Sequence, residues 1–117
     1  MADENKVFEA IELARSTGKI KKGTNEVTKI VEKGLAKLVV YAEDVEPKEV
    51  IMHLPALCKE KNIPIVKVAK KQDLGTVAGL QGKGASSIAI VQEGEAKNLI
   101  KEIVEGLKDG SSKAKGN

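Results

Sequence analysis

The feature that most constrains the fold is a run of five uncharged residues, 38–42 (Leu-Val-Val-Tyr-Ala), in a chain where 32% of residues are charged. A short continuous apolar run is typical of a strand that is buried on both faces. Apolar residues recur at helical spacing over 4–16 and 24–34 before it, and over 47–61 after it. Because helices must cover both faces of such a strand, we expect an α/β protein.

The rest of the chain continues this alternation. Further strands are predicted at 19–22, 63–69 and 87–92, and further helices at 70–79 and 95–107. The expected architecture is a three-layer α/β/α sandwich around a small central mixed sheet, formed by a single domain over residues 1–109. Residues 110–117 are rich in Gly, Ser and Lys, and we expect them to form a disordered basic tail.

The segment 24–34 is predicted to be a short helix that opens directly from a glycine turn. Thr24 or Asn25 can be its N-cap, because a short polar side chain there accepts a hydrogen bond from a backbone N–H. Gly34 fits the residue just beyond the helix. The apolar residues at helical spacing form the expected buried face: Val27, Ile30, Val31 and Leu35.

The opposite side of this helix mixes charges of both signs. Asn25 shares it with Lys29 and Lys33, and Glu26 lies in the first turn. Backbone N–H groups, the helix dipole and lysines attract phosphate. Asn and Glu instead pair with base edges. A carboxylate inside such a patch is unfavourable unless it meets a donor. A capped surface helix with solvated charges, or with Glu26 paired to Lys29, gives the same pattern without any ligand.

Composition excludes several classes of site. The formal charge of +3 permits an anionic partner without requiring one. Cys58 is the only cysteine, which excludes an internal disulfide and a structural zinc site. Phe8 and Tyr41 are the only aromatic residues, and both lie on apolar faces, so we expect no stacking grip on single strands. An RNA partner would be read by its folded shape.

No apolar run approaches the roughly 20 residues that a membrane span needs, and the N-terminus lacks a secretory segment. We therefore expect no membrane association and a cytoplasmic location.

The glycine-rich stretch 79–84 does not fit a nucleotide-binding loop. Val77 stands where a P-loop needs its first glycine, and a glycine stands where a hydroxyl residue is required. Without a recognisable nucleophile–base set, we expect no enzyme activity, cofactor or metal. Two alternatives stay open: a protein-interaction module without RNA, and a small enzyme that uses Asp44, Glu46 or His53.

Five separated blocks, collinear between about residues 4 and 108, resemble one known family. The blocks are Gly-Thr-Asn-Glu-Val-Thr-Lys (23–29), Ala-Glu-Asp-Val-Glu-Pro (42–47), His-Leu-Pro-Ala-Leu-Cys (53–58), Lys-Gln-Asp-Leu-Gly (71–75) and Ala-Ser-Ser-Ile-Ala-Ile (85–90). They resemble the kink-turn-binding ribosomal proteins of the archaeal L-seven-Ae type. The resemblance implies the α/β/α sandwich and binding to kink-turn and kink-loop RNAs, in which tandem sheared G·A pairs lie beside a three-nucleotide bulge.

The resemblance also implies which residues contact the RNA. Asn25, Glu26 and Lys29 would meet the G·A pairs, with Glu26 accepting hydrogen bonds from guanine N–H groups. The other implied residues are Lys22, Gly23, Thr24 and Lys33 around the helix start and the RNA backbone, Glu46, Val50 and Lys71 around the extruded nucleotide, and Leu80, Lys83 and Ala85 in the loop beside the bulged bases.

Members of this family serve in the large ribosomal subunit, in box C/D and H/ACA modification particles, and with ribonuclease P. The implied RNA partners are therefore large-subunit ribosomal RNA, box C/D and H/ACA guide RNAs, and ribonuclease P RNA. The implied protein partners are a Nop-domain protein and fibrillarin in the box C/D particle. We expect the free protein to be a monomer.

Overall fold

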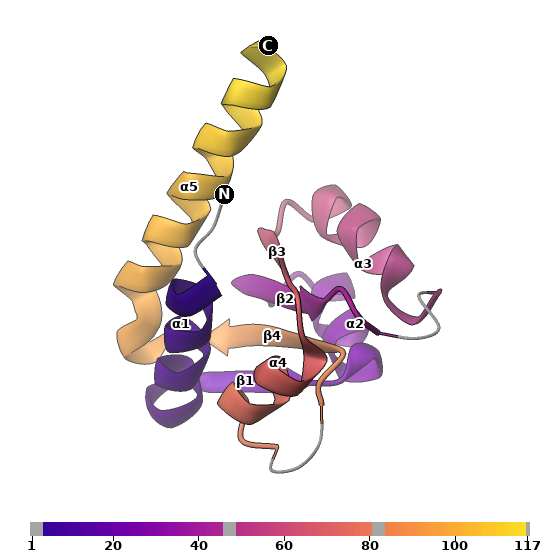
Figure 1. Cartoon of the computed structure of the whole chain (residues 1–117), viewed down its shortest axis with the longest axis vertical. Helices are drawn as coiled ribbons and strands as arrows, with labels where there is room; N and C mark the ends of the chain where they lie inside the picture. The colour runs from indigo at the N-terminus through magenta and orange to yellow at the C-terminus, as the bar shows by residue number, and fades with distance from the viewer. Residues whose placement is uncertain (1–3, 46–48, 81–83, 117) are drawn as a thin grey trace.

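The computed structural model describes residues 4–45, 49–80 and 84–116, with the backbone only at 4, 49–51 and 107–116. Helices and strands alternate as predicted (Figure 1). The elements are α1 (Glu4–Thr17), β1 (Lys19–Lys22), α2 (Thr24–Glu32), β2 (Leu38–Ala42), α3 (Glu49–Glu60), β3 (Ile65–Val68), α4 (Lys71–Val77), β4 (Ser87–Gln92), the 3-10 turn η1 (Gly94–Ala96) and α5 (Lys97–Gly116).

The strands form one mixed sheet in the order β1-β4-β2-β3. Strand β4 is antiparallel to both of its neighbours, with Lys22 of β1 opposite Ile88 and Tyr41 of β2 opposite Ser87. Strands β2 and β3 are parallel. This register brings the ends of β1, β2 and β3 and the beginning of β4 to the same edge of the sheet.

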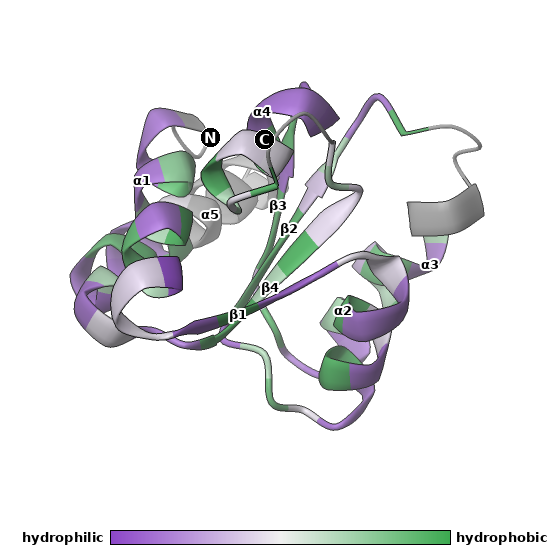
Figure 2. Ribbon diagram, turned by 90° about the horizontal axis from the view of Figure 1, so that it is seen from below, coloured by the Kyte–Doolittle hydropathy of each residue, from purple (hydrophilic) through white to green (hydrophobic). Residues whose placement is uncertain are grey.

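Helices cover both faces of the sheet. Helices α2 and α3 lie on one face, and α1, α4 and α5 lie on the other (Figures 1 and 2). Figure 2 shows apolar strand residues between the two helical layers. The residues of the central strands β2 and β4 that have no exposed surface are Leu38, Val39, Val40, Ala42, Ser87, Ile88, Ala89 and Ile90. The predicted three-layer α/β/α sandwich around a mixed sheet is therefore confirmed.

Two predictions about α2 are wrong. Its N-cap is Gly23, without a side-chain capping bond, rather than Thr24 or Asn25. Leu35 is 51% exposed instead of buried, because the chain turns at Gly34 and leaves the helix face. The backbone N–H groups of Gly34 and Leu35 bond back to the last helical turn, which confirms Gly34 as the residue just beyond the helix. The other three predicted core residues of α2 are buried.

The end of the chain also differs from expectation. Helix α5 continues to Gly116, where the sequence predicts a disordered tail over 110–117. Its last turns project beyond the sandwich (Figure 1). The first half is fixed by the buried side chains of Ile100 and Ile103. A helix that is already nucleated extends at little cost, since each added residue contributes one backbone hydrogen bond.

Helix α3 is described from Glu49 onward. Its predicted start at Pro47 lies outside the described residues. Pro55 lies inside this helix, and Asn62 at φ 58° closes it as predicted. Over the residues that the structure describes, no helix is both long and apolar enough to span a bilayer.

Candidate nucleic-acid interface

Four chain segments meet at the edge of the sheet where β1, β2 and β3 end. Backbone hydrogen bonds join them: the N–H of Gly23 donates to the carbonyl of Ser87 at 3.0 Å, and the N–H of Ala42 donates to the carbonyl of Ser86 at 3.0 Å. The hydroxyl groups of Thr24 and Ser86 are 2.7 Å apart. The start of α2 is thereby held against the start of β4.

Gly23 makes this junction possible. Its φ of 92° is a conformation that residues with a Cβ rarely adopt, and a Cβ there would meet no atom within 4 Å. The backbone angle rather than crowding therefore requires glycine. The first hydrogen bond within α2 runs from the N–H of Val27 to the carbonyl of Gly23 at 2.9 Å. The N–H groups of the three preceding residues lie before this bond, at the positive end of the helix dipole.

A second junction joins the end of β2 to the start of α4. The carboxylate of Asp44 accepts a hydrogen bond of 2.7 Å from the backbone N–H of Lys71, the first residue of α4. The residue at the N-cap of α4, Lys70, provides no side-chain cap, so Asp44 caps this helix from the turn that follows β2. The carbonyl of Lys71 in turn accepts from the N–H of Ala85 at 2.9 Å. One of the acids that the enzyme alternative invokes is thus engaged in a helix cap.

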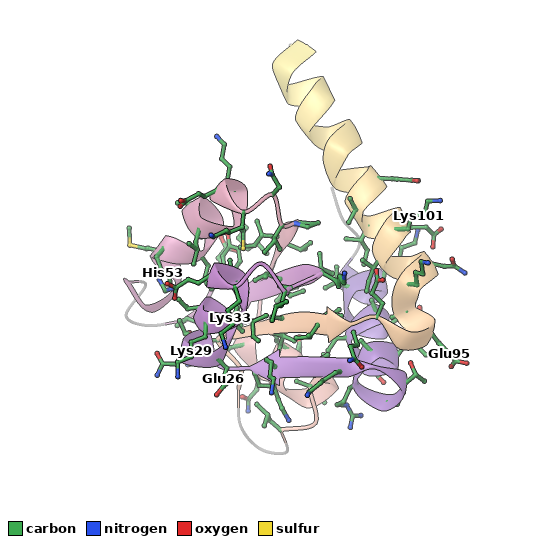
Figure 3. The ribbon with its side chains drawn as sticks, turned by 180° about the vertical axis from the view of Figure 1, so that it is seen from behind. Glu26, Lys29, Lys33, His53, Glu95 and Lys101 are labelled. Carbon is green, nitrogen blue, oxygen red and sulfur yellow. The ribbon has the colours of Figure 1, made fainter. Side chains whose placement is uncertain are left out.

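The outer side of α2 is charged and exposed. Glu26, Lys29 and Lys33 lie along it (Figure 3), and Asn25 beside them is also exposed. Within the described part of the chain, none of these three charged residues takes part in an ion pair. The pairing of Glu26 with Lys29, which would explain the charges without a ligand, is therefore not formed. The Glu26 carboxylate is available to accept hydrogen bonds from a partner.

A groove of about 370 Å³ lies between α2 and α3. Its lining residues are Thr28, Glu32, His53, Ala56, Leu57 and Glu60. The hydroxyl of Thr28 and Nε2 of His53 are 2.7 Å apart, which links the two helices. No other described group bonds to the ring of His53, so nothing orients it as the third member of a catalytic triad would.

The structure brings most of the predicted site residues to this one edge and to the adjoining side of α2. Those that are exposed are Lys22, Asn25, Glu26, Lys29, Lys33 and Lys71. Gly23 and Thr24 are half-buried and build the turn. Glu46 and Lys83 lie outside the described residues, and Val50, in the first turn of α3, is described by its backbone only.

The loop before β4 differs from what the resemblance implies. Ala85 is 3% exposed and belongs to the core, so its methyl group does not face a ligand in this conformation. Leu80 is half-buried against the same core. An apolar methyl group gains most by burial, and the backbone bond to Lys71 holds Ala85 inward. Ala85 therefore fixes the base of the loop.

Two contributors to this edge were not predicted in their observed roles. Ser86 holds the start of α2 through Thr24, and Asp44 was considered only as an acid of a hypothetical enzyme. Both contacts depend on strand register, which no local pattern reveals. In the part of the chain that the structure describes, no three His, Cys, Asp or Glu residues are grouped so that they could hold a metal ion.

The fold and the site define a class: an α/β/α sandwich whose mixed sheet presents a glycine-opened helix, with exposed lysines and one carboxylate, at a single edge. Residues 5–100 match the model of the ribosomal protein L7Ae/L30e/S12e/Gadd45 family, and the chain belongs to this family. It is similar to the solved structure of the 15.5kD RNA binding protein of Giardia lamblia, with a TM-score of 0.85 and 29% identity over 91% of this chain and 88% of that chain. These matches confirm the resemblance inferred from the five blocks.

Proposed function

We propose that this protein binds kink-turn and kink-loop RNAs through the start of α2 and the loops beside it, and that it acts by binding rather than by catalysis. The observation that carries the proposal is the exposed carboxylate of Glu26, which has no ion-pair partner among the described residues. A surface that bound phosphate alone would place only cations and N–H groups here, because a carboxylate repels phosphate. A carboxylate is useful where a base presents hydrogen-bond donors.

Two findings support RNA as the partner. The similar protein from Giardia lamblia is an RNA-binding protein, and the family is named after ribosomal proteins. The edge also fits a folded RNA better than a single strand, because Phe8 and Tyr41 are both half-buried. They are the only Phe, Tyr or Trp residues in the sequence, so no fully exposed ring of these three types offers a stacking surface.

In this proposal, each polar or charged group at the start of α2 has a role. Glu26 accepts from guanine N–H groups of the sheared G·A pairs, and Asn25 and Lys29 bond to the same bases. The N–H groups at the start of α2 and the ammonium groups of Lys22 and Lys33 neutralise phosphates. The hydrogen bonds to Ser86 and Ser87 hold the start of α2 rigidly, so these groups are in place before the RNA binds.

Within this proposal, the targets are large-subunit ribosomal RNA, box C/D and H/ACA guide RNAs, and ribonuclease P RNA. The bound protein, a monomer when free, nucleates assembly in the cytoplasm. In the box C/D particle it recruits a Nop-domain protein and fibrillarin. These particles follow from the family resemblance alone.

The test is Glu26→Gln, measured by gel shift against a kink-turn RNA and a plain RNA duplex. Loss of base contacts should weaken kink-turn binding by at least about fivefold, or about 1 kcal/mol. Affinity for the duplex should stay the same or rise, because a negative charge has been removed. The matched control is Glu32→Gln, the same charge change at another exposed position of α2.

Equal losses on both RNAs, or equal losses from Glu26→Gln and Glu32→Gln, would contradict base recognition. The alternative of a protein-interaction module without RNA binding predicts that the unaltered protein ignores the kink-turn RNA at moderate salt.

A further inference from the structure

The only arginine in this lysine-rich chain lies where α1 meets the end of α4. Arg15, in the last turn of α1, donates a hydrogen bond from Nε to the carbonyl of Val77 at 3.2 Å. Val77 is the last residue of α4, and its carbonyl is one of those that find no partner within the helix. A cation at a helix C-terminus is also favoured by the helix dipole. Arg15 therefore caps α4 from a different element.

The guanidinium of Arg15 also lies against the turn that follows α4. Gly79 has φ 86°, and a Cβ there would come within 3.1 Å of Arg15 Nη1 and 3.2 Å of Cδ. The side chain thus covers the glycine at close range. A planar guanidinium can lie flat against the backbone and donate from Nε at the same time, which a lysine ammonium cannot do.

The turn beneath Arg15 determines where the next segment begins. The N–H of Gly79 bonds to the carbonyl of Thr76 at 3.1 Å, and the N–H of Leu80 bonds to the carbonyl of Gly75 at 2.8 Å. The other end of the connection to β4 is fixed where Ala85 bonds to Lys71. By holding the C-terminus of α4 and the turn at Gly79, Arg15 accordingly fixes where the chain leaves α4. It thereby also fixes the position of Leu80.

We infer that Arg15 is a positioning residue for Leu80, the residue that follows the turn after α4, acting through the C-terminus of α4 without touching RNA. This inference rests on the proposed function, in which Leu80 lies beside the bulged bases. It assigns a role in RNA binding to a residue in a helical layer on the opposite face of the sheet from α2.

The test compares Arg15→Lys, which keeps the charge, with Arg15→Met, which removes it. Both should weaken kink-turn binding by about threefold to tenfold, the range that one net hydrogen bond supplies, and both should leave plain-duplex binding unchanged. The slope of log affinity against log salt should also stay unchanged. The matched control is Lys101→Met, which removes a positive charge from α5, away from α2 (Figure 3).

Two binding outcomes would overturn the inference. Full affinity in Arg15→Lys with a flatter salt slope in Arg15→Met would mean a direct phosphate contact. A lower melting temperature with unchanged kink-turn affinity in both variants would mean a structural role alone.

Amide hydrogen exchange on the free protein separates this inference from the proposed function. In Arg15→Lys the N–H of Leu80 should exchange about threefold to tenfold faster, as expected for one weakened hydrogen bond. The N–H of Val27 in α2 should keep its rate. Unchanged exchange at Leu80 would overturn the inference whatever the RNA data show. Absence of kink-turn binding by the unaltered protein would overturn the proposed function instead.

Discussion

At the scale of single residues, Asp44 and Glu26 are two carboxylates near the same edge of the sheet whose surroundings differ. Asp44 accepts a backbone N–H at 2.7 Å, whereas Glu26 is exposed and has no ion-pair partner among the described residues. The exposed position of Glu26 on α2 follows from helical spacing alone, so it could be predicted from the sequence. The role of Asp44 could not be predicted, because its partner Lys71 lies 27 residues further along the chain.

Cys58 provides a test at this scale. Burial raises the pKa of its thiol from 9.0 to about 11. Between those pH values the folded protein keeps a proton that the unfolded chain loses. The free energy of unfolding should therefore fall as pH rises through this window, and below it the thiol adds no pH dependence. Urea unfolding of the unaltered protein and of Cys58→Ala measures the effect.

Because lysines also titrate at high pH, only the difference between these two proteins reports the thiol. A decline for Cys58→Ala as steep as that of the unaltered protein would show that the pKa of the thiol is not raised in the folded protein.

At the scale of elements, α4 shows how a short helix depends on its neighbours. Seven residues are too few for a helix that is stable by itself. Its first turn is capped by Asp44, in the turn after β2, and its last turn by Arg15 of α1. The sequence predicts a helix over 70–79 from its apolar spacing, close to the observed bounds. It gives no sign of either cap, just as it places the N-cap of α2 at the wrong residue, because caps depend on tertiary contacts.

Asp44→Ala tests the capping role. Loss of the acceptor should lower the free energy of unfolding by about 1 kcal/mol, the usual cost of removing an N-cap. Asp73→Ala is the matched control, since it removes the same charge from the first turn of α4. Its cost should be smaller, because only the interaction with the helix dipole is lost. Urea denaturation compares the two, and equal costs would argue against a cap.

At the scale of the whole molecule, the mixed sheet brings four separate chain segments together at one edge, where β1, β2 and β3 end. The layered architecture could be predicted because helical and strand periodicities are local properties of the sequence. The strand order β1-β4-β2-β3 depends on pairing between distant segments. The burial of Ala85 likewise depends on a bond to another segment, at Lys71, whereas Leu35 is exposed because the chain turns locally at Gly34. Most of the residues that the resemblance implies lie at this edge or on the adjoining side of α2, but the resemblance does not give the hydrogen bonds that hold them there.

The edge should bind RNA partly through defined contacts between its lysines and phosphates. Lys33→Ala should weaken binding to a kink-turn RNA and to a plain duplex alike, and should flatten the salt slope by roughly 0.7–0.9, the contribution of one phosphate contact. Lys101→Ala, an equal charge change on α5, should leave both slopes unchanged. Salt titrations of both variants measure this, and equal slope changes would indicate diffuse attraction instead of a defined contact.

The carboxylate of Glu26 at the start of α2 is proposed to recognise bases in a bent RNA. The most direct test of this recognition is a calorimetric titration of the unaltered protein with two RNAs of equal length and charge. One carries an intact kink-turn, and in the other the sheared G·A pairs are replaced by Watson–Crick pairs. If the carboxylate recognises bases, the protein should bind the intact kink-turn at least about tenfold more tightly, since base-specific contacts contribute about 1–3 kcal/mol each. Equal affinity for the two RNAs would contradict this recognition.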